Sequence, residues 1–162
     1  MSQKTRQQKL AAYAGAYDEL VAALQRFPRA MWQFRPAPDG WTIHETIIHI
    51  TDSEANSFVR CRRLIAEPGS AVMGYDENIW ARRLDYHAHS TDDALELFRW
   101  LRHASHALVA AQPDSVWSHT IHHSEDGTMT MDDWLDTYAR HVTDHIAQMQ
   151  ATYEAWAAQP TQ

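Results

Sequence analysis

The chain has 162 residues, which is enough to bury a sizeable core, and we expect a single domain over residues 1–162. Its formal net charge of −7 argues against nucleic acid or an anionic membrane surface as a partner. The only cysteine, Cys61, excludes an internal disulfide and is typical of a reducing compartment. With neither an apolar leader nor a run of ~18 apolar residues, the sequence predicts a cytoplasmic protein.

Four long segments carry apolar residues at three- and four-residue steps, which predicts amphipathic helices. The spacing in Thr42-x-x-Glu45 predicts a capping box at the start of the second helix, and Asp133 is expected to assist the cap at Thr130. The four predicted helices cover about 4–27, 42–67, 91–111 and 130–156.

The connectors between these helices are unequal in length. About 25 residues separate the second helix from the third, long enough to return the chain along a bundle and leave those two helices parallel. Within this connector, residues 76–85 are expected to form a short helix. Residues 115–130 alternate around Glu125-Asp126-Gly127, which favours a small hairpin. The sequence therefore predicts an all-α, four-helix bundle with a long crossover between helices 2 and 3.

Two histidines interrupt the apolar seam of the last predicted helix. His141 and His145 are four residues apart, so on a helix they lie on one face and can bind one ion together. Burying two unpaired imidazoles would cost several kcal/mol of lost hydration unless something satisfied them. A metal would satisfy both; hydrogen bonds to neighbouring carboxylates or backbone are the structural alternative.

His49 is a third candidate ligand, two turns into the second helix and flanked by isoleucines. A lone histidine on an apolar helix face is more often a core residue than a ligand. If it did join the other two, three neutral imidazoles would leave an ion its full 2+ charge, which suits Zn, Ni, Fe or Co.

Other polar residues are weaker candidates. His103 and His106 share a side with Arg99 and Arg102 and are expected to face solvent. Asp52 and Asp144 each follow a candidate ligand by three residues and could orient it or lie on the surface. Cys61 lies twelve residues along the helix from His49, about 18 Å away, too far to join the same ion. A fourth ligand or proton shuttle could come from a connector histidine: His87, His89, His119, His122 or His123.

The sequence resembles the DinB superfamily of bacterial four-helix bundles. The resemblance rests on Gly40-Trp41-Thr42-x-x-Glu45-x-x-x-His49-Ile50-x-Asp52-x-Glu54 and on Arg140-His141-x-x-x-His145-Ile146-x-Gln148. It implies an up-down-down-up topology, frequent homodimers, and a divalent metal site made by His49, His141 and His145.

The resemblance also implies several activities. Some members of the superfamily are thiol S-transferases that join bacillithiol or mycothiol to an electrophile, and others are metal-dependent hydrolases or isomerases. We expect a thiol S-transferase of detoxification or stress response acting on a small molecule. In that enzyme the ion would hold the thiol sulfur as a thiolate. A hydrolase and a non-catalytic metal- or small-molecule-binding module are the alternatives. No catalytic residue is identified, and the candidates for lining an electrophile pocket are Trp41, Trp80, Trp134 and Tyr138.

Overall fold

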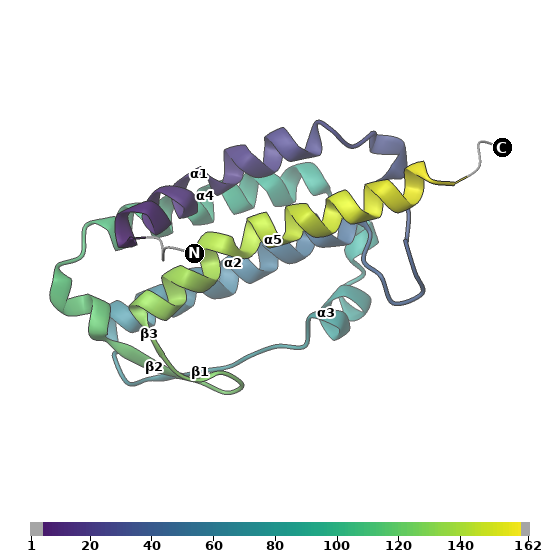
Figure 1. Ribbon diagram of the computed structural model, residues 1–162. Helices are drawn as coiled ribbons and strands as arrows, with labels where there is room; N and C mark the ends of the chain where they lie inside the picture. Colours follow the sequence, from purple (N-terminus) through teal and green to yellow (C-terminus); the bar gives the residue numbers. More distant parts are fainter. Residues whose placement is uncertain (1–4, 160–162) are drawn as a thin grey trace.

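Four long helices run side by side along the molecule in the computed structural model, which describes residues 5–159 (Figure 1). The first and last helices run in one direction and the other two in the opposite direction, so the topology is up-down-down-up. Each helix packs against two neighbours, in the pairs α1/α5, α5/α2, α2/α4 and α4/α1. This confirms the predicted bundle. The four helices are α1 (Arg6–Leu24), α2 (Ile43–Ala66), α4 (Thr91–Ala110) and α5 (Met131–Ala157).

The predicted caps are present at two of the helix starts. The Thr42 hydroxyl accepts from the Glu45 amide at 3.1 Å, and the Glu45 carboxylate accepts from the Thr42 amide at 2.9 Å. Thr130 and Asp133 form the same reciprocal pair at the start of α5. These local hydrogen bonds satisfy amides that have no partner within the helix, which fixes where α2 and α5 begin.

The first helix is shorter than predicted. Its predicted start at Lys4 lies outside the described residues, and Thr5 caps the observed helix through Gln8. It ends at Leu24 rather than Phe27. The amides of Arg26 and Phe27, just before Pro28, donate to carbonyls three residues back instead of the four of an α-helix. Phe27 is still buried, so its apolar side chain packs into the core although its backbone lies in the turn after α1.

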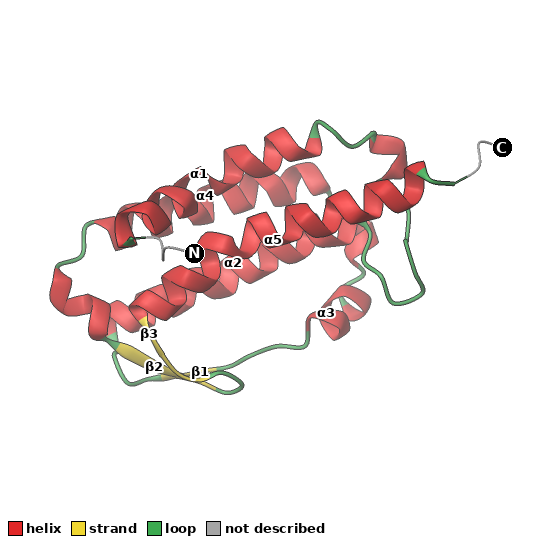
Figure 2. Ribbon diagram, in the orientation of Figure 1, coloured by secondary structure: helices red, strands yellow, loops and turns green. Residues whose placement is uncertain are grey.

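The long crossover between α2 and α4 carries the short helix α3 (Glu77–Arg83), which confirms the helix predicted there (Figure 2). Asp76 caps it by accepting from the Ile79 amide at 2.8 Å. The crossover runs back along the outside of the bundle, and α3 lies near the end where α4 begins. Of the described helices, α3 included, none is both long and apolar enough to cross a membrane.

A small sheet stands at the other end of the bundle (Figure 2). The predicted hairpin is present, with Gly127 at a positive φ of 74° where its loop enters the second strand. The crossover adds a third strand parallel to the first strand of the hairpin. This third strand has only two residues and no periodic signal, so the prediction is right for the bundle and the hairpin and omits this strand. The strands are β1 (Ala71–Val72), β2 (Thr120–His123) and β3 (Gly127–Thr130), in the order β1-β2-β3.

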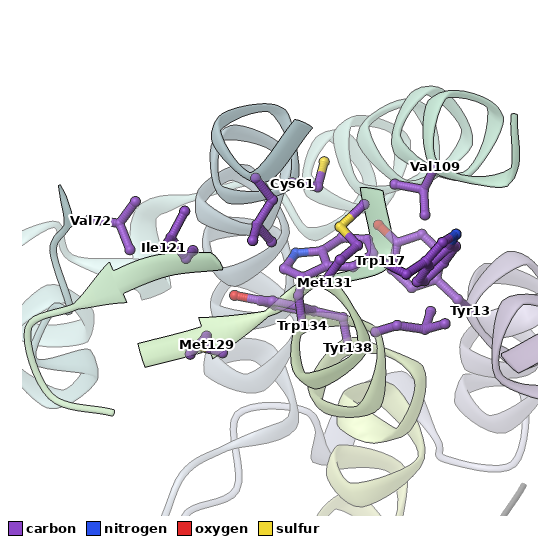
Figure 3. Close-up of a cluster of buried hydrophobic side chains, with 12 residues drawn as sticks. Tyr13, Cys61, Val72, Val109, Trp117, Ile121, Met129, Met131, Trp134 and Tyr138 are labelled. Atoms are coloured by element: carbon purple, nitrogen blue, oxygen red, sulfur yellow. The ribbon is translucent and has the colours of Figure 1, made fainter. Parts of the chain in front are cut away.

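Two clusters of buried apolar side chains fill the bundle. The cluster near the sheet contains Cys61, Trp134 and Tyr138 (Figure 3), and the second, toward the other end, contains Ile47, Ile50 and Val142. Tyr138 and Val142 are neighbours along one face of α5, so the two clusters meet there. In sequence, His141 falls between Tyr138 and Val142 at this boundary, while His49 and His145 are flanked by residues of the second cluster.

One charged pair is buried in the bundle. Arg102 is 2% exposed and lies 2.6 Å from the Glu54 carboxylate, which is 1% exposed. Arg102 is therefore not a marker of the exposed side of α4, although its place beside His103 and His106 was the reason for expecting those histidines to face solvent. Tyr13 donates its hydroxyl to Glu54, and the guanidinium lies 3.9 Å from the centre of the Tyr13 ring. His103, next in the sequence, is exposed as expected.

Candidate metal centre

The three histidines singled out in the sequence lie together between α2 and α5. One ring nitrogen from each of His49, His141 and His145 lies within 4.8 Å of the other two. The ring centres are 5.4 Å apart for His49 and His141, 4.8 Å for His49 and His145, and 4.5 Å for His141 and His145. The four-residue spacing places the last two on one face of α5, and α2 supplies the third from the neighbouring helix.

His49 is fully buried and has no hydrogen-bond partner within the described residues. Its side chain is 0% exposed in the folded chain, and neither Nδ1 nor Nε2 finds a partner. Leaving a buried polar group unsatisfied costs about 1–3 kcal/mol. A cation held between α2 and α5 would supply the missing partner, so the residues present fit a metal ion at this point.

The three imidazoles are neutral near pH 7. Burial, with a smaller effect from the neighbouring rings, lowers the pKa of His49 to about 3 and that of His141 to about 2. Burial also lowers the pKa of His145. Neutral imidazole is the form that coordinates metal ions, so the environment that removes these rings from water also keeps them ready to ligate.

Gln148 orients the ring of His145. Nδ1 of His145 donates to the Gln148 side-chain oxygen at 2.8 Å, which leaves Nε2 of His145 free to accept. That Nε2 faces Nε2 of His141 at 3.2 Å. Gln148 stands in the motif that carries the family resemblance, but no role was predicted for it. Its position one turn after His145 is the signal that could have indicated one.

The carboxylates considered as orienting groups point elsewhere. Asp52 accepts a hydrogen bond from the Tyr86 hydroxyl at 2.6 Å, while His49 has no partner, so Asp52 does not orient His49. Asp144 is exposed and lies 4.0 Å from Arg140. Although Asp52 follows His49 by one helical turn, its carboxylate binds Tyr86 in the segment after α3 and not the His49 ring.

None of the connector histidines is placed to complete the site. His87 faces Glu45, His89 the Leu84 carbonyl, His119 the Leu64 carbonyl, His122 the Thr128 hydroxyl, and His123 Asp126. The suggestion that one of them approaches the three histidines is therefore wrong. Each is held by a partner near its own position in the fold, which sequence spacing could not reveal.

A carboxylate from the crossover does reach the site. Oε1 of Glu77, in the first turn of α3, lies 3.8 Å from Nε2 of His49, and the Glu77 side chain is about half exposed. Burial, and then the nearby Glu125 and Asp76 carboxylates, raise the pKa of Glu77. Nothing local in the sequence marks Glu77 as a residue of this site, because only the path of the crossover brings α3 back to α2.

Two of the four aromatic candidates border the histidines. The Trp41 ring meets His49 edge to face, with centres 4.9 Å apart, and the Tyr138 ring lies 6.1 Å from that of His141. The Trp80 ring packs against that of Tyr75 in the crossover, with centres 4.3 Å apart and planes tilted by 41°. Trp134 is 0% exposed inside the core cluster near the sheet (Figure 3), so it cannot line a substrate pocket.

Fold and site together define a helical bundle with a candidate metal centre of three neutral imidazoles. The sequence profile of the DinB superfamily matches residues 12–149, and the chain belongs to this superfamily. The matched region contains all three histidines and Glu77. The family resemblance inferred from the sequence motifs is thereby confirmed.

Relatives in the superfamily carry names that mention a metal. A protein of Oceanobacillus iheyensis, named as a candidate metal-dependent hydrolase, is 29% identical over 108 residues, which cover 67% of this chain and 62% of its own length. YfiT of Bacillus subtilis, with a similar name, is 28% identical over 109 residues, covering 67% of this chain and 61% of its own length. The matched segments thus span less than two thirds of each relative.

The structure of YfiT from Bacillus subtilis has the same fold. It superposes with a TM-score of 0.85 at 21% sequence identity, covering 98% of this chain and 93% of YfiT. That structure is described as a candidate metal-dependent hydrolase with an unusual four-helix bundle topology. At this level of identity, the similarity establishes the shared topology of the bundle.

Proposed function

We propose that this protein binds one divalent transition metal ion through His49, His141 and His145 and is a metal-dependent enzyme. The observation that carries the proposal is the fully buried His49 ring, whose two nitrogens lack partners while two further neutral imidazoles face it. Nitrogen ligands of this kind suit Zn, Ni, Fe or Co. The metal-dependent names of the relatives support the same reading.

The chain's own residues supply binding and orientation. Three neutral ligands add no charge of their own, and Gln148 fixes the ring of His145 so that Nε2 points inward. The half-buried Trp41 ring lies beside His49, and Tyr138 packs beside His141 from the buried core. When bound, the ion would act as a Lewis acid toward a substrate or a nucleophile.

The first candidate reaction is hydrolysis of a small-molecule substrate, which the names of the relatives support. The second is transfer of a small thiol to an organic electrophile, which Trp41 supports, because its half-buried ring beside His49 suits an apolar substrate group. The two reactions differ in the nucleophile, water in one and a thiol in the other.

The test is turnover by metal-loaded protein with ester, amide and electrophile panels, each with and without added thiols. We expect one equivalent of metal per chain and a product whose formation stops on chelation. Product formed with water alone supports the hydrolase, and thiol-dependent product supports the transferase. Stoichiometric metal without turnover in any panel would contradict the enzyme and favour a binding module.

Removal of the ion should lower the melting temperature without unfolding the bundle. A ligand at 100 times its dissociation constant stabilises the folded state by about 2.7 kcal/mol. For a chain of this size that corresponds to a shift of roughly 5–10 °C. Calorimetry and circular dichroism with and without a chelator measure both effects. Complete loss of helical signal at room temperature on chelation would contradict the prediction, because the two apolar clusters should keep the bundle folded.

A further inference from the structure

The crossover places a carboxylate against the one candidate ligand that comes from α2. Oε1 of Glu77 is 3.8 Å from Nε2 of His49, a nitrogen without a hydrogen-bond partner. In a tetrahedral site with ligands about 2.0–2.2 Å from the ion, neighbouring donor atoms stand about 3.4 Å apart. The observed separation is close to that value, and the Glu77 side chain is half exposed and free to adjust its rotamer.

A second set of contacts holds the first turn of α3 at the site. Trp41, whose ring meets His49, donates its Nε1 hydrogen to the Asn78 side-chain oxygen at 2.9 Å. Asn78 follows Glu77 directly, so this hydrogen bond ties the backbone beside Glu77 to the wall of the histidine cluster. The Asp76 cap fixes the helix start on the other side of Glu77.

The Glu77 carboxylate has no positively charged partner among the described residues. No Lys or Arg nitrogen in that part of the chain lies within 4.0 Å of it, and its acidic neighbours Asp76 and Glu125 add further negative charge. A divalent ion at the three histidines would lie beside Glu77 and be attracted to its carboxylate.

We propose that Glu77 is a fourth, displaceable protein ligand of the metal centre; this rests on the proposed binding of a metal by the three histidines. Because the carboxylate comes from a short helix in a connector and stays half exposed, it would be the ligand that a substrate or nucleophile could replace. A displaceable fourth ligand would allow the protein to bind the ion tightly and still open the coordination position that catalysis requires.

The test compares metal affinity and Co(II) absorption in Glu77→Gln, Glu77→Ala and the unaltered protein. Affinity is measured by competition with a chromophoric chelator. Loss of an anionic ligand should weaken binding by about 10-fold or more, given that even outer partners of ligands contribute about 10–100-fold. The visible bands of bound Co(II) should also change in energy and intensity, since these report on the donor set. The matched control is Glu125→Gln, which removes a nearby exposed carboxylate and should change neither measurement appreciably.

The outcomes separate this inference from the proposed function. If the unaltered protein binds no metal, both fail. If metal binds through the histidines and both Glu77 variants keep the Co(II) spectrum, Glu77 is not a ligand and this inference alone is overturned. An equal loss of affinity in the Glu77 and Glu125 variants, with unchanged spectra, would likewise overturn it, because the effect would then be one of charge alone.

Discussion

Replacing His49 with alanine should abolish stoichiometric binding of a divalent transition metal, and the same result is expected for alanine at His141 or His145. Two remaining imidazoles make a weak site. The loss of metal affinity should therefore exceed the about 10–100-fold loss that follows removal of a residue hydrogen-bonded to a ligand. Metal content after gel filtration and affinity by chelator competition measure the effect. Unchanged metal content in the His49 variant would contradict a site that spans α2 and α5.

Two controls separate the loss of ligation from the loss of structure. His103→Ala removes an exposed histidine from α4 and should bind metal normally. His49→Leu fills the buried position with an apolar side chain and removes two unsatisfied nitrogens. In metal-free protein this variant should therefore be at least as stable as the unaltered chain, while binding no metal. A folded, stable protein without metal would show that His49 is retained for binding rather than for stability.

The local signals in the sequence were sufficient for the bundle. Apolar spacing and the caps at Thr42 and Thr130 depend on residues within one or two turns, so they can be recognised without knowing the fold. The length of the crossover then determined that α2 and α4 are parallel. The strand β1 could not be predicted, since two residues carry no periodicity and their pairing with β2 is set by the path of the chain.

The residues of the candidate site also differ in whether the sequence alone could predict them. His141 and His145 are neighbours on one helix, and their place in an apolar seam was visible in the sequence. His49 needed the family resemblance, because nothing local pairs α2 with α5. Glu77 was missed, since its approach to His49 depends on how the crossover returns. Ligation of a metal by the three histidines stays a prediction; their convergence is what the structure establishes.

The burial of Arg102 could not be predicted either, because it depends on a partner in another helix. An arginine on an amphipathic helix usually faces water, and its partner Glu54 is 48 positions away on α2. In the structure the Arg102 guanidinium also donates to the backbone carbonyls of Tyr13 and Tyr138. The buried pair therefore connects α4 with α1, α2 and α5, one turn along α5 from His141.

Replacing Arg102 with methionine should lower the free energy of unfolding by about 3–5 kcal/mol, because Glu54 would be left as an unpaired buried carboxylate. Urea denaturation in the presence of a chelator measures the effect without a contribution from metal binding. The matched control is Arg99→Met on the same helix, which breaks an exposed pair with Glu96 and should leave the free energy of unfolding almost unchanged.

The double variant Glu54→Leu with Arg102→Met distinguishes the cost of an orphaned charge from the loss of the pair itself. Because a buried ion pair replaced by apolar side chains is often no less stable, the double variant should recover much of the loss seen in Arg102→Met. Recovery should be incomplete, since the Tyr13 hydroxyl and the carbonyl of Tyr138 lose their partners. A double variant less stable than the sum of the two single changes would contradict the account of Glu54 as an uncompensated charge. So would an Arg102→Met protein within about 1 kcal/mol of the unaltered chain, a loss no larger than that of an exposed pair.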